Sequence, residues 1–242
     1  MSAYLISLLA AFILGMSKAG LKGIGVLFVT LMALVHGAKA STGIVLLLLI
    51  FADILAVSYY NRYAQWKYLK RFLPWVVAGV LVAVLVGKEL PEALFKKAMA
   101  LIILISVVLM LLGERYERKD IPEKLWFAGT MGFTAGFTTM IGNLAGAFAN
   151  IFFLATRLPK NEFIGTAAWL FFIINIFKLP FHIFSWETVT WDSFMTDLWL
   201  LPGVIIGFVV GLQLVKKFKN DQYRKFILIM TAIGALMLLW PT

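Results

Sequence analysis

Two lysines lie inside a glycine-rich break near the start of an otherwise apolar chain. The stretch GMSKAGLKGIG, residues 15–25, contains Lys18 and Lys22 between runs of hydrophobic residues. A lysine ammonium is a point charge that binds anions, and Gly23 and Gly25 let a ligand approach the backbone closely. If a short helix begins there, its unpaired N–H groups add to the attraction. The stretch therefore predicts an anion-binding site.

A second glycine-rich break, AGFTTMIGNLAG at residues 135–146, carries no charge. In this break Thr138, Thr139 and Asn143 are expected to offer neutral hydrogen bonds to the same anion. The backbone from Asn143 to Gly146 is expected to cradle it, as the Gly23–Gly25 backbone does in the first break. The two breaks together predict one substrate site.

Three further polar residues lie inside long apolar runs, where polar side chains are costly and mark functional sites. Asp53 is expected to pair with Lys18 or Lys22, or to bind a proton when unpaired, which would couple the site to a proton gradient. A fixed structural salt bridge is the alternative. Asn175 and Lys178 share one face of a later run. We interpret Asn175 as a site residue and Lys178 as a second cationic arm, unless Lys178 snorkels toward the nearer membrane surface.

Residue types that support enzymatic or metal chemistry are scarce. The chain has no cysteine, and neither a G-x-S-x-G nor an H-E-x-x-H motif occurs. His36 and His182 lie near the ends of predicted segments without a second ligand at fixed spacing, so interfacial positions are favoured over a metal ligand or proton relay. We predict no enzyme, no metal and no cofactor.

Composition indicates the elements that position these residues. Hydrophobic residues make up 62% of the 242 positions and charged residues 14%, whereas soluble domains carry about 25% charged residues. A membrane-spanning helix needs about 20 apolar residues. The sequence therefore predicts an all-α polytopic membrane protein. Ten hydrophobic segments are expected, at residues 3–16, 24–35, 40–60, 67–87, 93–113, 124–138, 144–156, 162–184, 194–215 and 222–240.

The segments divide into two similar halves. The charged run GERYERKDIPEK separates a first transmembrane repeat, residues 1–113, from a second, residues 124–242, through a cytoplasmic linker, residues 114–123. Five segments in each half would make the second repeat inverted relative to the first, as in many secondary transporters. The matched pairs include Gly15 with Gly136, Lys22 with Asn143, Gly25 with Gly146, Asp53 with Asn175, and Gly79 with Gly207.

The first two segments of each half are too short to cross a bilayer comfortably. At about 1.5 Å per residue, segment 3–16 falls short of the roughly 30 Å hydrocarbon core. We expect broken or re-entrant helix pairs, one from each face, with their glycine-rich tips near the membrane centre. In the alternative, segment 3–16 does span and the two lysines lie in an ordinary cytoplasmic loop.

Small residues recur every four positions in the fourth segment of each half, which predicts close helix packing. These residues are Gly79, Ala83 and Gly87, and then Gly203, Gly207 and Gly211. The same small-residue faces could instead pack against a second copy of the chain, so a homodimer is possible.

The positive charge is distributed unevenly between the loops. The net charge of +10 lies in short loops rather than on one face, so we predict no nucleic-acid partner. With the 61–71 loop in the cytoplasm, most basic residues are cytoplasmic, and both termini lie outside a bacterial inner membrane. The opposite side keeps Lys39, Lys88, Lys96 and Lys97 and an acidic loop with Glu187, Asp192 and Asp197.

The chain resembles the TauE/SafE sulfite exporter family of membrane permeases. The resemblance rests on LGMSKAGLKGIG and AGFTTMIGNLAG, on the Thr42-Gly43 and Gly165-Thr166 pairs, and on the small-residue fourth segments. It implies movement of small sulfur oxyanions and organosulfonates across the inner membrane. One departure is that the first break carries lysines and the second is uncharged, so the two halves cannot contribute equally.

These observations predict a secondary transporter that exports sulfite or short organosulfonates by proton coupling. Its partners would be the small anion and the lipid bilayer. A passive anion channel or uniporter for small oxyanions is the alternative, which the sequence does not separate from the first.

Overall fold

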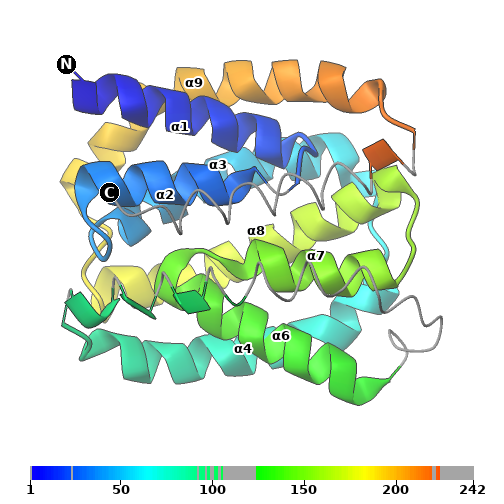
Figure 1. The fold of residues 1–242 in the computed structure, drawn as a ribbon, viewed down its shortest axis with the longest axis horizontal. Coiled ribbons are helices and arrows are strands. Elements are labelled where there is room, and N and C mark those ends of the chain that lie inside the picture. The colour runs from blue at the N-terminus through cyan, green and yellow to red at the C-terminus, as the bar shows by residue number, and fades with distance from the viewer. Residues whose placement is uncertain are drawn as a thin grey trace.

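Every regular element in the described part of the chain is a helix (Figure 1). The computed structural model describes residues 2–22, 24–91, 93–95, 97–98, 101–102, 105, 124–219 and 222–223. The predicted linker and most of segments 93–113 and 222–240 lie outside these ranges. The elements are α1 (Ser2–Lys18), α2 (Gly25–His36), α3 (Ser41–Tyr60), the 3-10 helix η1 (Asn61–Tyr63), α4 (Trp66–Lys88), α6 (Leu125–Gly142), α7 (Ala145–Ala155), α8 (Lys160–Phe184) and α9 (Trp191–Lys216).

Four of these helices are long and apolar enough to cross a membrane. They cover Ser41–Tyr63, Trp66–Lys88, Lys160–Phe184 and Trp191–Lys216. Three others, α1, α2 and α7, are apolar but shorter. The predicted all-α polytopic membrane protein is confirmed, and the chain is a multi-pass membrane protein.

The helices pack in pairs around a central pair. Figure 1 shows α1 with α9 along one edge and α4 with α6 along the opposite edge, with α2, α3, α7 and α8 between them. Helices α3 and α8 pack against each other in the middle. The polar residues of the long runs, Asp53 on α3 and Asn175 and Lys178 on α8, are thereby buried in the protein rather than exposed to lipid.

Glycines let the edge helices approach each other closely, as the small-residue pattern predicts. A Cβ added to Gly207 on α9 would lie 2.0 Å from the Phe12 carbonyl oxygen of α1, and one on Gly15 would lie 2.1 Å from the Val204 oxygen. Any side chain at either glycine would force these two helices apart.

The same kind of contact joins α4 to α6. A Cβ on Gly79 would lie 2.0 Å from the Phe133 carbonyl oxygen, and one on Gly136 would lie 2.0 Å from the Val76 oxygen. Gly79 and Gly136 are the sequence matches of Gly207 and Gly15, so matched glycines make matching contacts at the two edges.

Both glycine-rich breaks interrupt the helices, but the helices run further than expected. Helix α1 ends at Lys18 and the backbone turns at Gly20, whose φ of 127° suits glycine. Helix α6 continues to Gly142 and ends at Asn143, which has a left-handed φ of 56° and whose N–H bonds the Thr139 carbonyl. Lys18 and Thr139 therefore lie on helix ends rather than in loops.

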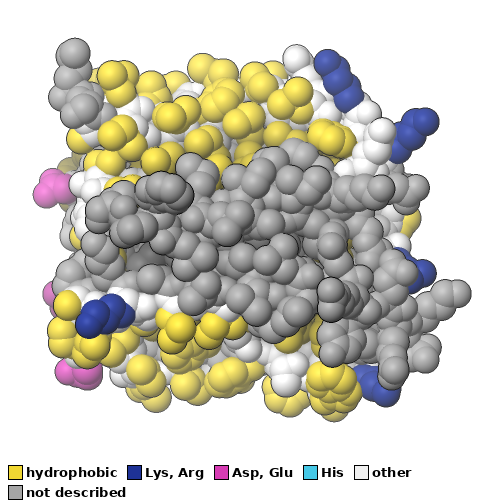
Figure 2. Space-filling view, viewed as in Figure 1, with side chains coloured by type: hydrophobic (Ala, Val, Ile, Leu, Met, Phe, Trp, Pro, Cys, Tyr) yellow, Lys and Arg dark blue, Asp and Glu magenta, His cyan; other side chains and the backbone are white. Residues whose placement is uncertain are grey.

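Charged side chains gather at the two ends of the helix bundle (Figure 2). We call the end where α3 and α9 finish the basic end, and the other the opposite end. The basic end contains Arg62, Lys67, Lys70, Arg71, Arg157, Lys160, Lys216 and Lys217, whereas Lys39, Lys88, Glu187 and Asp192 lie toward the opposite end.

The prediction that Asp197 belongs to an acidic loop is wrong. Thr190 and Ser193 form a capping box that starts α9 at Trp191, so Asp197 lies in the second turn of a helix. Its side chain is fully buried, and neither carboxylate oxygen has a hydrogen-bond partner in the described residues.

Candidate functional site

A central cavity of about 80 Å³ is lined by residues from both breaks and from α3 and α8. Most of the lining is apolar, with a few polar groups that converge on the space, which is typical of small-ligand sites. The polar lining residues are Ser17, Lys18, Lys22, Thr139, Asn143, Asn150 and Asn175. One water needs roughly 10–15 Å³ of such cavity space, so a cavity of this volume has room for a small anion.

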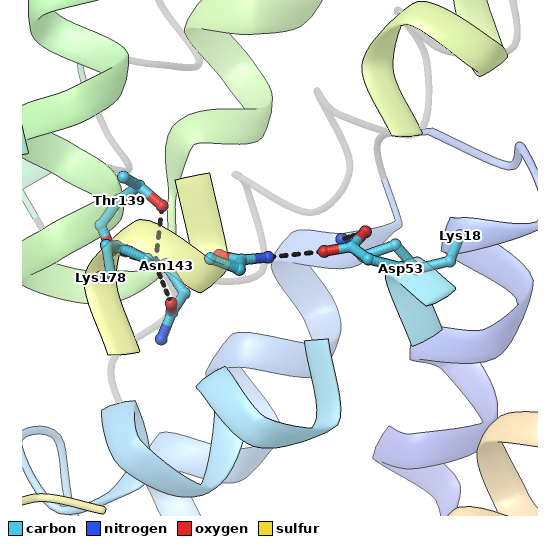
Figure 3. Close-up of polar contacts among 6 residues, drawn as sticks. Lys18, Asp53, Thr139, Asn143 and Lys178 are labelled. Carbon is cyan, nitrogen blue, oxygen red and sulfur yellow. Dashed lines mark hydrogen bonds and ion pairs between the residues drawn. The ribbon is translucent and has the colours of Figure 1, made fainter. Parts of the chain in front are cut away.

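At the first break, Lys18 is neutralised by Asp53. The Lys18 ammonium lies 2.5 Å from Asp53 Oδ1, and Asn175 Nδ2 donates to Asp53 Oδ2 at 2.7 Å. All three side chains are buried. Each carboxylate oxygen thus has a donor, which is the arrangement a buried charge needs. The contact joins α1, α3 and α8 across the two halves of the chain (Figure 3).

Lys22 is the other cation of the first break and has no such partner. Its side chain is 4% exposed and lines the cavity. Within the described ranges its ammonium makes no hydrogen bond or ion pair, and lies 5.4 Å from the centre of the Phe171 ring. An aromatic face attracts a cation only modestly, whereas burial of an unpaired charge is costly. An anion in the cavity would offset that cost.

The second break obtains its positive charge from another helix. Lys178 on α8 donates to Asn143 Oδ1 at 2.7 Å, to Thr139 Oγ1 at 3.0 Å and to the Thr139 carbonyl at 3.1 Å. These contacts satisfy all three ammonium donors. Asn143 Nδ2 also donates to the Thr42 carbonyl at 3.2 Å. Lys178 therefore fixes the end of α6 against α8 (Figure 3), and Asn143 fixes it against α3.

Two helices begin at the cavity. Helix α2 starts at Gly25 and α7 at Ala145, and neither has a side-chain cap on its N-terminus. Their first N–H groups have no partner within the helix. Gly25 and Gly146 both line the cavity, and a Cβ on Gly146 would meet nothing within 4 Å. Two helix N-termini and an unpaired ammonium therefore face one space, an arrangement that favours a negatively charged ligand.

Comparison with known families agrees with this chemistry. The profile of the family described as sulfite exporter TauE/SafE matches residues 5–238, nearly the whole chain. The chain belongs to the TauE/SafE family. No curated protein and no solved structure matches it. This match confirms the predicted resemblance. TauE/SafE is a family of membrane transporters.

In this TauE/SafE member most of the predicted site residues meet at the cavity. Those that line it are Lys18, Lys22, Gly25, Thr139, Asn143, Gly146 and Asn175. Asp53 and Lys178 lie behind the lining, bonded to residues that form it. Thr138 does not line the cavity, and its hydroxyl donates to the Ala135 carbonyl at 3.2 Å. Gly23 lies outside the described residues.

Among the cavity residues that the sequence analysis did not predict, three carry a polar group or contact a lysine. Asn150 on α7 is 3% exposed, and its Oδ1 has no partner in the described chain. Asn150 is a polar residue within the apolar helix AGAFANIFFLA. A polar residue in a membrane segment marks a candidate functional site, so the sequence did contain a signal for it. Ser17 and Phe171 gave no comparable signal. The Phe171 ring lies 4.8 Å from the Lys18 ammonium and 5.4 Å from that of Lys22, a proximity that depends on how α1 and α8 each pack against α3.

Proposed function

We propose that this chain is a secondary transporter that moves sulfite or short organosulfonates out of the cell by proton coupling. The observation that carries the proposal is the buried ammonium of Lys22, which has no partner among the described residues and lies on a cavity shared by both breaks. Membership of the TauE/SafE family supports the class of substrate.

The cavity offers such an anion several donors at once. An oxygen of the anion would accept a hydrogen bond from the Lys22 ammonium, and a second would face the N–H groups where α2 begins. A third would face the start of α7, near Gly146. Charge-assisted hydrogen bonds of this kind are about twice as strong as neutral ones. The apolar wall from Leu14, Phe28 and Val29 would accommodate the carbon chain of a sulfonate.

Asp53 would couple transport to protons through Lys18. Lys18 forms an ion pair with Asp53. A bound anion competes for the same ammonium, because Lys18 also lines the cavity. When Lys18 turns to the anion, Asp53 loses its cation and binds a proton in exchange. Asn175, which also bonds Asp53, would hold the carboxyl group in place during this step.

Two inverted repeats, residues 1–113 and 124–242 joined by the linker 114–123, would provide alternating access around this site. The matching glycine contacts of α1 with α9 and of α6 with α4 support that proposal. The concentration of lysine and arginine at the basic end supports its placement in the cytoplasm of a bacterium, with both termini outside.

Flux in proteoliposomes tests the function directly. Purified protein is reconstituted, and uptake of sulfite and then of a short sulfonate is measured with and without an imposed pH gradient. Gradient-driven accumulation is expected. Downhill flux that ignores the gradient would instead identify a channel or uniporter, and absence of flux for both anions would overturn the proposed substrates.

The Lys22→Ala variant tests the site in the same assay. We expect transport to fall to background, while the protein stays folded because an unpaired buried charge has been removed. Lys216→Ala, a change at an exposed lysine of the basic end, is the matched control and should transport like the unmodified protein. Normal flux in Lys22→Ala would reject Lys22 as the anion ligand.

A further inference from the structure

Helix α8 carries a row of buried polar side chains that leads away from the cavity. Asn175, Lys178 and His182 are 2%, 0% and 0% exposed, and their spacing places them on one helix face. Asn175 lines the cavity. His182 lies about 10 Å further along the helix, at about 1.5 Å per residue. The row therefore runs from the cavity toward the opposite end of the bundle.

His182 lies near the end of α8, where its side chain is buried under a turn rather than exposed. Its Nδ1 is 2.7 Å from Thr188 Oγ1, and its ring packs against Trp186 with centroids 5.3 Å apart. The N–H groups of Thr188 and Val189 both donate to the His182 carbonyl. The Nε2 atom is buried and has no hydrogen-bond partner among the described residues.

Thr188 connects this imidazole to the opposite end of the molecule. A surface depression of about 480 Å³ is lined by Thr188 together with Lys39, Glu187, Asp192, Ser193 and Thr196. The Thr188 backbone packs tightly on α3, since a Cβ on Gly43 would lie 1.9 Å from the Thr188 carbonyl oxygen. The turn that carries this hydroxyl therefore packs closely on α3 beside the depression.

We propose that His182 is a proton-binding residue that links this depression to the second break. A hydronium ion in the depression gives a proton to the Thr188 hydroxyl, which passes its own proton to Nδ1. One O–H bond of hydronium is broken and one N–H bond on the imidazole is formed. The charged groups around the site are Lys178 on α8, Glu187 on the turn, Lys39 before α3 and Asp192 on α9.

Protonation of His182 acts on the break through Lys178. The two residues are one helical turn apart, and like charges at that spacing repel each other. The imidazolium therefore weakens the hold of Lys178 on Thr139 and Asn143, which frees the end of α6 to move. The link to flux rests on the proposed transport function, whereas proton binding by His182 does not.

Proton binding is measured by nitrogen NMR. The chain has two histidines, so His36→Gln leaves one imidazole in the full-length protein. This variant, labelled with ¹⁵N-histidine and placed in lipid nanodiscs, is titrated over the pH range in which it stays folded. We expect the ring nitrogens to change from neutral to imidazolium shifts. An imidazole that stays neutral throughout would overturn the proposal.

Flux decides whether this proton is coupled to transport. In proteoliposomes with sulfite as probe, His182→Gln should have a smaller pH-gradient-driven component, with the coupling through Asp53 retained, and should keep sulfite exchange at equal pH. His36→Gln, which changes the histidine that bonds Ser7, is the matched control and should behave like the unmodified protein. Unchanged gradient-driven uptake in His182→Gln would overturn the coupling. If the unmodified protein carries no sulfite, the proposed function fails, and the titration still decides proton binding.

Discussion

The two glycine-rich breaks occupy matching places in the sequence but carry their charge differently. The first contains its own lysines, of which Lys18 is neutralised by Asp53 and Lys22 has no partner in the described part of the chain. The second contains none and is held by Lys178 from α8. The Lys22 ammonium of the first break is therefore available to a ligand, whereas the Lys178 ammonium at the second break is occupied by hydrogen bonds that hold α6. Both halves line the cavity, but the lysine ammonium left without a described partner comes from the first half.

Exchanging charge between the breaks is the strongest test of this comparison. Asn143→Lys places an ammonium beside Lys178 and removes one of its acceptors. An uncompensated buried charge destabilises by about 3–5 kcal/mol. A lysine in the left-handed backbone conformation of position 143 costs roughly 1 kcal/mol more. We expect a large fall in thermal stability. The double variant with Lys22→Asn should not recover, and recovery would mean that the breaks are interchangeable.

Asp53→Asn tests the paired half of the first break. Loss of the carboxylate leaves Lys18 buried without its counter-charge, which destabilises by about 3–5 kcal/mol. Chemical denaturation in detergent micelles measures the change. Adding Lys18→Met should restore part of the lost stability, because both members of the ion pair are then uncharged. A double variant no more stable than Asp53→Asn would contradict the assigned pair.

Lys178→Met and Lys22→Met separate the structural lysine from the unpaired one. Lys178→Met loses three hydrogen bonds from an ammonium. A hydrogen bond to a charged group contributes about 1.5–3 kcal/mol to the free energy of unfolding. We expect it to unfold at a lower temperature, while Lys22→Met unfolds at or above the normal temperature. Equal melting temperatures for the two variants would remove the distinction drawn between the breaks.

Asp197→Asn is the smallest change and serves as the matched control for Asp53→Asn. Asp197 is as buried as Asp53 but has no hydrogen-bond partner among the described residues. Replacement by the isosteric amide removes no described contact, so we expect a change within about 1 kcal/mol or a gain in stability. A loss as large as that of Asp53→Asn would reveal a partner for Asp197 and would weaken the contrast.

Much of the helix pattern could be predicted because bilayer length and hydrophobicity constrain it directly. The predicted segment 40–60 corresponds to α3 at Ser41–Tyr60, and 162–184 corresponds to α8 at Lys160–Phe184. The ends of the helices at the breaks were less predictable. Thr138 and Thr139 are weak helix formers, yet α6 continues through them, because tertiary packing outweighs intrinsic propensity.

The candidate site was predictable by residue type but not by partner. Lysines in a glycine-rich break and an aspartate in an apolar run stand out in any membrane sequence. The sequence left open whether Asp53 pairs with Lys18 or with Lys22, and the structure places it on Lys18. The buried state of Asp197 was missed, because its position relative to α9 depends on where the capping box starts the helix.

The amino-acid sequence by itself determined that this chain is a helical membrane protein with two interrupted helix pairs, since apolar length and glycine position are local properties. Only the tertiary structure decided which cation is free. Lys18 and Lys22 are similar in sequence, but α3 presents one carboxylate at one depth, and Lys18 is the lysine within its reach. Charge pairing over a few ångströms depends on how distant segments pack, and local sequence does not specify that distance.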